Sequence, residues 1–321
     1  MTIDFLYNEG PRGALGLGRL NLGDLLCSPK SYFHLESDKR TLIIGGGIQS
    51  SYITGKKRPP EGYDKVVVWG GGLSSEPKKT LQSDIDGIDI WTIRDRDCVP
   101  DDQHWLPCVS CMHPMMDHPA VENVPGRALL YINADPVIYS PSALLKSRRI
   151  AKEHGLDFCT NRADQEDFFD KWHKCERVVT NSYHGIYWSL LAGKKVSIFG
   201  YNYKFRSLIS ILSLKTRVIT FDKQNRASLI EATRAATVEK DSVSLPDSAA
   251  VLTGYRKMQT CFAEILYEEG IISRFSEVTH DPAALQKRSD AREMPRVLSE
   301  YISAADRSLG TRMRRLRARM K

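Results

Sequence analysis

The chain contains the sequence Arg177-Val178-Val179-Thr180-Asn181-Ser182-Tyr183-His184-Gly185. Its first part is a short apolar run that predicts a buried strand, and residues 185–192 are predicted as the helix that follows. The first N–H groups of a helix lack partners within the helix, and the helix dipole favours negative charge there. The turn from Asn181 to Gly185 is therefore predicted to bind an anion at the centre of an active site.

Similar short apolar runs lie on both sides of this stretch, and their continuous hydrophobicity is typical of parallel strands covered on both faces. A first group comprises residues 41–44, 65–69 and 88–93, and a second comprises residues 127–132, 157–160, 177–180 and 196–199. Helices are predicted between the strands of the second group, at residues 142–154 and 163–174. Strands that alternate with helices at this spacing predict parallel sheets. We expect an α/β protein with two Rossmann-like domains and a cleft between them.

A stretch rich in Pro, Cys and His from Val99 to Pro125 separates the two groups of strands. The sequence therefore predicts an N-terminal domain at residues 1–124 and a second domain, carrying the anion site, at residues 125–272. A long helical pattern from Ser248 to Glu269 is expected to close the second domain. Residues 273–321 are expected to form a basic, partly helical tail.

The composition is that of a globular protein, with 321 residues of which 41% are hydrophobic and 26% are charged. No apolar run approaches the roughly 20 residues that span a bilayer. The N-terminus has an early acid, Asp4, and neither a basic region nor a sustained apolar stretch, so we expect no secretory signal and a cytoplasmic location. Seven cysteines are an odd number scattered over a long chain, which favours reduced thiols.

The net charge of +7 is concentrated at the C-terminus. Residues 306–321 contain seven Lys or Arg and one Asp, so the rest of the chain is nearly neutral and nucleic-acid binding is not expected. The end of the tail, residues 310–321, is either a basic amphipathic helix on anionic lipid or a solvated chain end. The first alternative would place the protein peripherally on the inner face of the membrane.

In open α/β sheets the ligand lies beyond the carboxyl ends of the strands, so residues that directly follow strands are candidates for the site. Gly46 and Gly71 belong to triple-glycine turns, which either admit a ligand close to the main chain or are simply tight strand exits. Arg94 and Arg96 follow the strand at 88–93. Arg94 is predicted to clamp phosphate or carboxylate, whereas Arg96 either shares that task or belongs to a surface ion pair.

Cys108-Val109-Ser110-Cys111 has the spacing of half a zinc site, and His104, His113 and His118 are nearby in the sequence. A second cysteine pair at a known zinc-finger spacing is absent from the sequence. A reduced, buried thiol pair is therefore favoured over structural zinc.

Several motifs, taken in their order along the chain, resemble the polysaccharide pyruvyl transferase family. The resemblance covers about residues 15–215, is strongest at residues 178–196, and does not extend to residues 275–321. Its motifs are Asn21-Leu22-Gly23-Asp24, the two glycine turns, Arg94-Asp95, Pro107-Cys108-Val109-Ser110-Cys111-Met112 and Thr180-Asn181-Ser182-Tyr183-His184-Gly185-Ile186-Tyr187-Trp188.

The resemblance implies two Rossmann-like domains arranged as in a glycosyltransferase of the B type. It also implies transfer of pyruvate from phosphoenolpyruvate to a sugar of a cell-surface glycan or exopolysaccharide, which gives a pyruvate ketal and phosphate. Acceptors in this family are often lipid-linked or close to a membrane. No cofactor and no metal are expected, because phosphoenolpyruvate is itself the donor substrate.

Within this reaction, His184 is the candidate acid/base or phosphate ligand, and either Asp24 or Asp135 is the candidate base for the acceptor hydroxyl. Asn181, Ser182 and the amides near Gly185 are expected to complete the anion pocket. Many family members carry Arg two residues before the family histidine, where this chain has Ser182. The missing positive charge comes from Arg94, Arg96, Lys204 or Arg206, or the donor differs.

Two other classes of protein fit the same sequence. One is a glycosyltransferase that uses a sugar nucleotide, because a cleft between two Rossmann-like domains also serves that chemistry. The other is a catalytically silent binding or scaffold protein for polysaccharide assembly. This alternative stays open because the chain has Ser182 where many family members have Arg.

Overall fold

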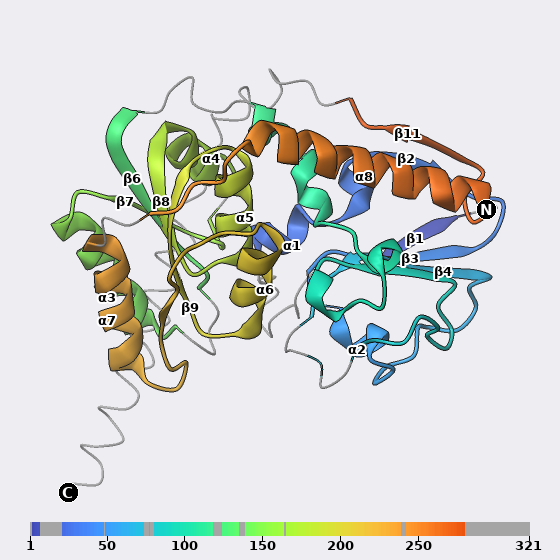
Figure 1. Ribbon diagram of the computed structural model, residues 1–321, viewed down its shortest axis with the longest axis horizontal. Coiled ribbons are helices and arrows are strands. Elements are labelled where there is room, and N and C mark those ends of the chain that lie inside the picture. Colours follow the sequence, from blue (N-terminus) through green and yellow to red (C-terminus); the bar gives the residue numbers. More distant parts are fainter. Residues whose placement is uncertain are drawn as a thin grey trace, which may run out of the picture.

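The computed structural model describes residues 2–6, 21–47, 49–73, 77, 80–117, 124–134, 139–163, 165–238 and 242–279. The predicted base Asp135 and the end of the basic tail lie outside these residues. In the described part, two parallel sheets with flanking helices confirm the predicted α/β class (Figure 1).

The first sheet has four parallel strands in the order β1-β3-β4-β5. They are β1 (Ile3–Leu6), β3 (Thr41–Gly45), β4 (Lys65–Gly71) and β5 (Ile90–Ile93). The last three coincide with predicted strands, whereas β1 was not predicted. β1 pairs with β3 from Ile3 opposite Thr41 to Leu6 opposite Ile44. The glycine turns and Arg94 therefore lie at the carboxyl edge of this sheet.

The second sheet has five parallel strands in the order β10-β9-β8-β6-β7. They are β6 (Val124–Ile132), β7 (Asp157–Thr160), β8 (Cys175–Thr180), β9 (Lys195–Gly200) and the short β10 (Ile219–Thr220). The chain passes from β6 to β7 on one side and returns to β8 on the other. The strand order thus reverses between β6 and β8, which is where ligands bind in open α/β sheets.

Helices cover both faces of the second sheet, which explains why its strands are apolar at successive positions. Leu129 of β6 packs in one core with α4 (Gln165–Lys174) and α5 (Tyr183–Leu191). Leu130, the next residue, packs in the opposite core with α3 (Pro141–Glu153) and α7 (Arg226–Val238). Figure 1 shows α3 and α7 together on one side of the sheet. Alternate side chains of each strand are buried on opposite faces, as expected for a covered parallel sheet.

Helix α8 (Ser248–Glu268) confirms the predicted long helix but does more than close the second group of strands. It runs along the molecule from the second sheet to the first (Figure 1). Tyr255 packs in the core beneath α5, whereas Phe262 packs with Trp69 of β4. Gln259 lies between them, fully buried, and its Oε1 accepts a 2.8 Å hydrogen bond from Trp69 Nε1. One helix therefore stabilises the packing of both halves.

A small antiparallel pair lies beside the first sheet. β11 (Arg274–Glu277) pairs with β2 (Phe33–Glu36), so the first residues of the range predicted as tail return to the N-terminal half. The remaining helices are short or lie near the site: α1 (Leu22–Leu25), α2 (Ser50–Ile53) and α6 (Tyr203–Ile211). Among the described helices, none is both long enough and apolar enough to cross a membrane.

Candidate functional site

The strand-to-helix turn after β8 begins α5 with Ser182 as its N-cap. Ser182 Oγ accepts a hydrogen bond of 3.3 Å from the Gly185 amide, so this amide already has a partner. Gly185 is required by packing, because a Cβ here would lie 2.6 Å from the Tyr131 ring. The Ser182 amide also has a partner, since it donates to Thr180 Oγ1 at 3.0 Å. The predicted anion turn is therefore a capped helix start in which two of the predicted amide donors are already used.

Three asparagines each follow a strand of the second sheet and tie the strand ends together. Asn181 Oδ1 accepts from the Asn133 amide at 2.7 Å, and Asn161 Nδ2 donates to Asn133 Oδ1 at 2.8 Å. Asn161 Nδ2 also contacts Oδ1 of Asn21, the N-cap of α1, at 3.2 Å. Asn181 is fully buried and acts here as part of the scaffold that holds α1 against the second sheet.

His184, at the start of α5, is enclosed by groups from both halves of the chain. Its ring stacks on Trp188, with centroids 5.2 Å apart, and its Nδ1 faces Gly23 of α1. A Cβ on Gly23 would lie 2.1 Å from Nδ1, so only glycine permits this approach. His184 Nε2 lies 2.8 Å from Cys27 Sγ and 3.3 Å from Arg94 Nη1. The predicted catalytic histidine is thus in direct contact with the predicted anion clamp.

Arg94 follows β5 directly and brings a buried positive charge into the site. Its side chain is 3% exposed, and its guanidinium carbon lies 3.9 Å from the centre of the Tyr183 ring. Among the residues that the structure describes, Arg94 Nε has no hydrogen-bond partner. No carboxylate among these residues forms an ion pair with the Arg94 guanidinium. A buried guanidinium with an unused donor favours an anionic ligand. Gly72 leaves room for this group, because a Cβ there would lie 2.5 Å from Arg94 Nη2.

Asp24 and Lys204 complete the charged surroundings. Asp24 in α1 is half-buried and accepts a hydrogen bond of 2.8 Å from Asn21 Nδ2. Burial raises the pKa of Asp24, while the charges of His184, Arg94 and Lys204 oppose that rise. The Lys204 side chain, on α6, lies over the rings of Tyr201 and Phe205. The structure therefore brings together four of the predicted site residues: Asp24, Arg94, His184 and Lys204.

The two predicted glycines support the site rather than line an open turn. Gly46 has φ +78°, and a Cβ on it would lie 3.3 Å from the main chain and Cβ of Cys27. A Cβ on Gly71 would lie 3.2 Å from side chains of Ile53 and Val68. Gly46 thus allows Cys27 to lie against the carboxyl end of β3, whereas Gly71 packs within the first half.

Arg96 takes no part in the cluster. Its Nη2 forms an ion pair of 3.0 Å with Asp102, and its guanidinium lies 5.1 Å from the centre of the Trp105 ring. About half of its side chain is exposed. Of the alternatives offered by the sequence, the surface ion pair describes Arg96 in this structure.

Two cysteines adjoin His184, and the sequence pointed to only one of them. Cys27 follows α1, and Cys108 is the N-cap of the short 3-10 helix η4 (Val109–Met112). Their Sγ atoms are 3.3 Å apart, and both side chains are buried. The sequence signal that could have identified Cys27 is its position, three residues after the predicted site residue Asp24.

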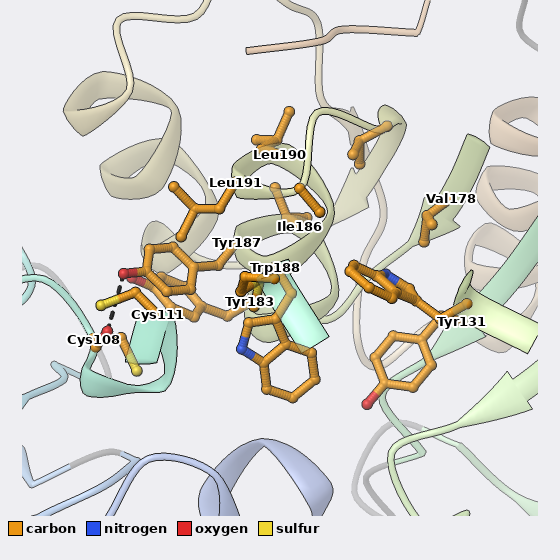
Figure 2. Packing of buried hydrophobic residues seen from close by; sticks show 14 of the residues in the cluster. Cys108, Cys111, Tyr131, Val178, Tyr183, Ile186, Tyr187, Trp188, Leu190 and Leu191 are labelled. Carbon is orange, nitrogen blue, oxygen red and sulfur yellow. Dashed lines mark hydrogen bonds between the residues drawn. The ribbon is translucent and has the colours of Figure 1, made fainter. Parts of the chain in front are cut away.

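The second cysteine of the predicted pair, Cys111, is separate from this cluster. It is fully buried, and its pKa is raised to about 12 by burial and by the nearby Cys108. Tyr187 of α5 donates a hydrogen bond of 3.0 Å to the Cys108 carbonyl, as Figure 2 shows. The loop of both cysteines is thereby fixed against α5.

Cys27, Cys108 and His184 place three atoms that can ligate metals within 4.8 Å of one another, in the part of the chain that the structure describes. Arg94 Nη1 can only donate, so the His184 Nε2 lone pair is its acceptor. A cation at this position would also lie beside the guanidinium. We therefore assign no metal to the cluster.

One cavity, of about 280 Å³, lies elsewhere in the second half. Its lining includes Arg127, Arg177 and Lys195, at the amino ends of β6, β8 and β9. Ligands of parallel sheets bind at the opposite, carboxyl edge. The cavity therefore does not compete with the His184 cluster as the candidate site.

Comparison of the chain with protein-family models, curated proteins and solved structures found no match in any of the three. The function is therefore inferred from the contacts of the site and from the motifs described above.

Proposed function

We propose that the protein is a pyruvyl transferase that moves pyruvate from phosphoenolpyruvate to two hydroxyls of a glycan sugar and releases phosphate. The observation that carries the proposal is the contact between Arg94 and His184. It joins the carboxyl end of β5 in the first sheet to the first turn of α5 behind β8 in the second. Two of the motifs that carry the family resemblance, those of Arg94 and of His184, therefore contribute to one buried site.

The same contact supports an arrangement like that of a B-type glycosyltransferase. In that arrangement, the carboxyl edges of two Rossmann-like domains face one another across the substrates. Here the residues that follow β5 and β8 touch, and α1 lies against the ends of β7 and β8 through Asn161 and His184. Donor and acceptor would be held between the two sheets.

Each charged group has a role in this reaction. The carboxylate and phosphate of phosphoenolpyruvate carry the charge that Arg94 and Lys204 neutralise, which compensates for Ser182 at the position where many family members have Arg. His184 moves a proton between the acceptor hydroxyl and the departing phosphate. Burial raises the pKa of Asp24, which makes its carboxylate a stronger base, and we propose that it assists as the base. Asp135 is the alternative from the sequence.

Replacement of His184 tests the proposal. We expect His184→Ala to abolish phosphate release from phosphoenolpyruvate in the presence of acceptor, whereas His154→Ala, at the exposed end of α3, leaves it unchanged. Near-normal turnover by His184→Ala would remove the histidine from the mechanism. If the wild type consumes a sugar nucleotide and leaves phosphoenolpyruvate intact, the protein is a glycosyltransferase instead.

A further inference from the structure

Asp95 lies between the two halves of the chain and has no part in the function proposed so far. It follows Arg94 directly, and its side chain is 1% exposed. Its Oδ2 accepts a hydrogen bond of 2.8 Å from the Leu73 amide, and its Oδ1 accepts one of 3.0 Å from Ser207 Oγ. This buried carboxylate therefore connects the end of the first sheet to helix α6 of the second half.

The hydrogen bond from Leu73 holds the main chain against which the Arg94 guanidinium lies. Leu73 follows Gly72, and a Cβ on Gly72 would lie 2.5 Å from Arg94 Nη2 and 2.6 Å from Arg94 Nε. The Arg94 amide also donates to the Gly71 carbonyl at 3.0 Å. Because Asp95 fixes the Leu73 amide, it fixes the segment of backbone that orients the Arg94 side chain.

The hydrogen bond from Ser207 acts on the second cation of the site. Lys204 precedes Ser207 by three residues in α6, so the two side chains lie on the same face of the helix. Figure 1 shows α6 beside α5, on the side of the second half that faces the first. Lys204 is one of the cations whose charge opposes the rise that burial causes in the pKa of Asp24. The position of Lys204 relative to the first sheet therefore depends on the bond between Asp95 and Ser207.

Two other contacts join α6 to the loop after Asp95, and they are less enclosed. Ser210 Oγ donates to Asp97 Oδ1 at 3.2 Å, and both residues are exposed. Tyr203 Oη and Cys98 Sγ lie 2.9 Å apart in a part-buried contact. Water can replace the partners of an exposed hydrogen bond, but it does not reach a buried one. The Asp95–Ser207 bond therefore sets the position of α6 more strictly than the exposed contact does.

The charge of the buried Asp95 carboxylate is compensated from both sides. Burial raises the pKa of Asp95, whereas the charge of Arg94 and the hydrogen bonds from Leu73 and Ser207 lower it. Arg94 provides this compensation without an ion pair, so its guanidinium keeps its donors for a ligand. A change at Asp95 therefore alters both the charge and the geometry of the site, whereas a change at Ser207 alters the geometry alone.

We propose that Asp95 is a positioning residue that aligns the two cations of the site, Arg94 and Lys204, for one anionic donor. This inference rests on the proposed function, because it takes phosphoenolpyruvate as the donor. Phosphoenolpyruvate carries a carboxylate and a phosphate, so cations that bind it together need a fixed separation. Asp95 provides that separation, because one of its oxygens holds the backbone beside Arg94 and the other holds the helix of Lys204.

A double-mutant cycle between Ser207 and Lys204 tests the alignment. Ser207→Ala removes the bond that holds α6 and leaves both cations in the chain. We expect Lys204→Met to weaken phosphoenolpyruvate binding about 10-fold in the wild-type background and no more than about 3-fold in the Ser207→Ala background, because a misplaced ammonium contributes less. Calorimetric titration measures the affinities. If Ser207 is merely structural, Ser207→Ala lowers stability but leaves the effect of Lys204→Met unchanged, which would overturn the inference.

Ser210→Ala is the matched control, because it removes an exposed bond one turn further along the same helix. In this background, Lys204→Met should weaken binding about 10-fold, as in the wild type. Asp95→Asn should weaken binding at least as much as Ser207→Ala, since an amide keeps one acceptor oxygen and turns a donor towards the second donor. Asp97→Asn, at an exposed position, should leave the affinity unchanged. If Asp95→Asn fails to fold, the cycle at Ser207 still decides the question.

The same cycle with inorganic phosphate separates the inference from the proposed function, because both cations can bind this anion whichever reaction the protein catalyses. Coupling with phosphate, together with no binding of phosphoenolpyruvate by the wild type, would support the alignment and remove the proposed function. Binding of both anions, with equal effects of Lys204→Met in both backgrounds, would overturn the alignment and leave pyruvyl transfer standing. If the wild type binds neither anion, both proposals fail.

Discussion

Arg94 Nη1 donates to His184 Nε2 across 3.3 Å, between two residues that are 90 positions apart in the chain. Arg94 follows a strand of the first sheet, and His184 begins the helix behind the central strand of the second. Because Arg94 can only donate, the contact makes Nε2 an acceptor. Among the residues that the structure describes, Arg94 Nε has no hydrogen-bond partner. The hydrogen bond between Arg94 and His184 therefore assigns the tautomer of His184, and the unpaired Nε of Arg94 is the donor that we propose for the anion.

Replacement of Arg94 by Met should weaken phosphoenolpyruvate binding by about 10- to 100-fold, because charge-assisted hydrogen bonds contribute about 1.5–3 kcal/mol. Calorimetric titration measures the affinity. Arg96→Met is the matched control: its exposed ion pair with Asp102 contributes at most about 1 kcal/mol to stability, and its loss should leave the affinity unchanged. Equal losses of affinity in the two variants would contradict the role given to Arg94.

Gly23→Ala should disturb His184 without altering any charge. The new Cβ would lie 2.1 Å from His184 Nδ1, and overpacking of this kind costs about 1–3 kcal/mol of unfolding free energy. Gly254→Ala in α8 is the control, because nothing lies near its Cβ and alanine stabilises a helix interior by about 0.5–1 kcal/mol. Chemical denaturation compares the two. A Gly23→Ala variant as stable and active as the wild type would contradict the close approach of the His184 ring to Gly23.

Asp24→Asn should be more stable than the wild type at neutral pH and less active. Burial raises the pKa of Asp24 above its ordinary value of 3.8, so the folded chain holds this proton more tightly than the unfolded chain. The wild type therefore loses stability as the pH rises through the raised pKa, whereas the neutral Asn does not. The difference in unfolding free energy should disappear as the pH falls below 3.8. A difference in unfolding free energy that grows towards acid pH would contradict this prediction. Asp84→Asn, at an exposed position, is the control and should leave the unfolding free energy unchanged.

Ser182→Ala removes the N-cap of α5 and should cost about 1 kcal/mol of stability. Ser140→Ala removes the equivalent cap of α3, where Oγ accepts from the Ala143 amide at 3.2 Å, and should cost a similar amount. If the Ser182 hydroxyl also donates to the donor phosphate, only Ser182→Ala weakens phosphoenolpyruvate binding, by several-fold for a neutral hydrogen bond of about 0.5–1.5 kcal/mol. Identical affinities in both variants would limit Ser182 to the cap.

Much of the fold was predictable because its strands are buried on both faces. Continuous apolar runs such as Leu129 to Ile132 are a local signal, and the structure places β6 there. β1 lacked that signal, since Asp4 interrupts four residues that become a strand only by pairing with β3. The dual packing of α8 was also missed, because periodicity shows that a helix has an apolar face but not which cores that face contacts.

The site was predictable in its separate parts but not in its assembly. Arg94 and His184 each follow a strand, which is a local property, and the sequence singled out both. Cys27 was missed because its partners, Cys108 and His184, are 81 and 157 residues away and no local spacing connects them. Arg96 is also an arginine and lies two residues after Arg94, so the sequence does not separate their roles. Only the structure shows that the Arg96 side chain forms an ion pair with Asp102 at the surface.

The most direct test of the central claim is incubation of the purified protein with phosphoenolpyruvate and candidate glycan extracts, with phosphate and glycan mass followed together. The account predicts that each phosphate released is matched by one pyruvate ketal on the glycan, and that both products vanish in His184→Ala. Phosphate release without a change in glycan mass, or glycan modification that requires a sugar nucleotide instead, would contradict it.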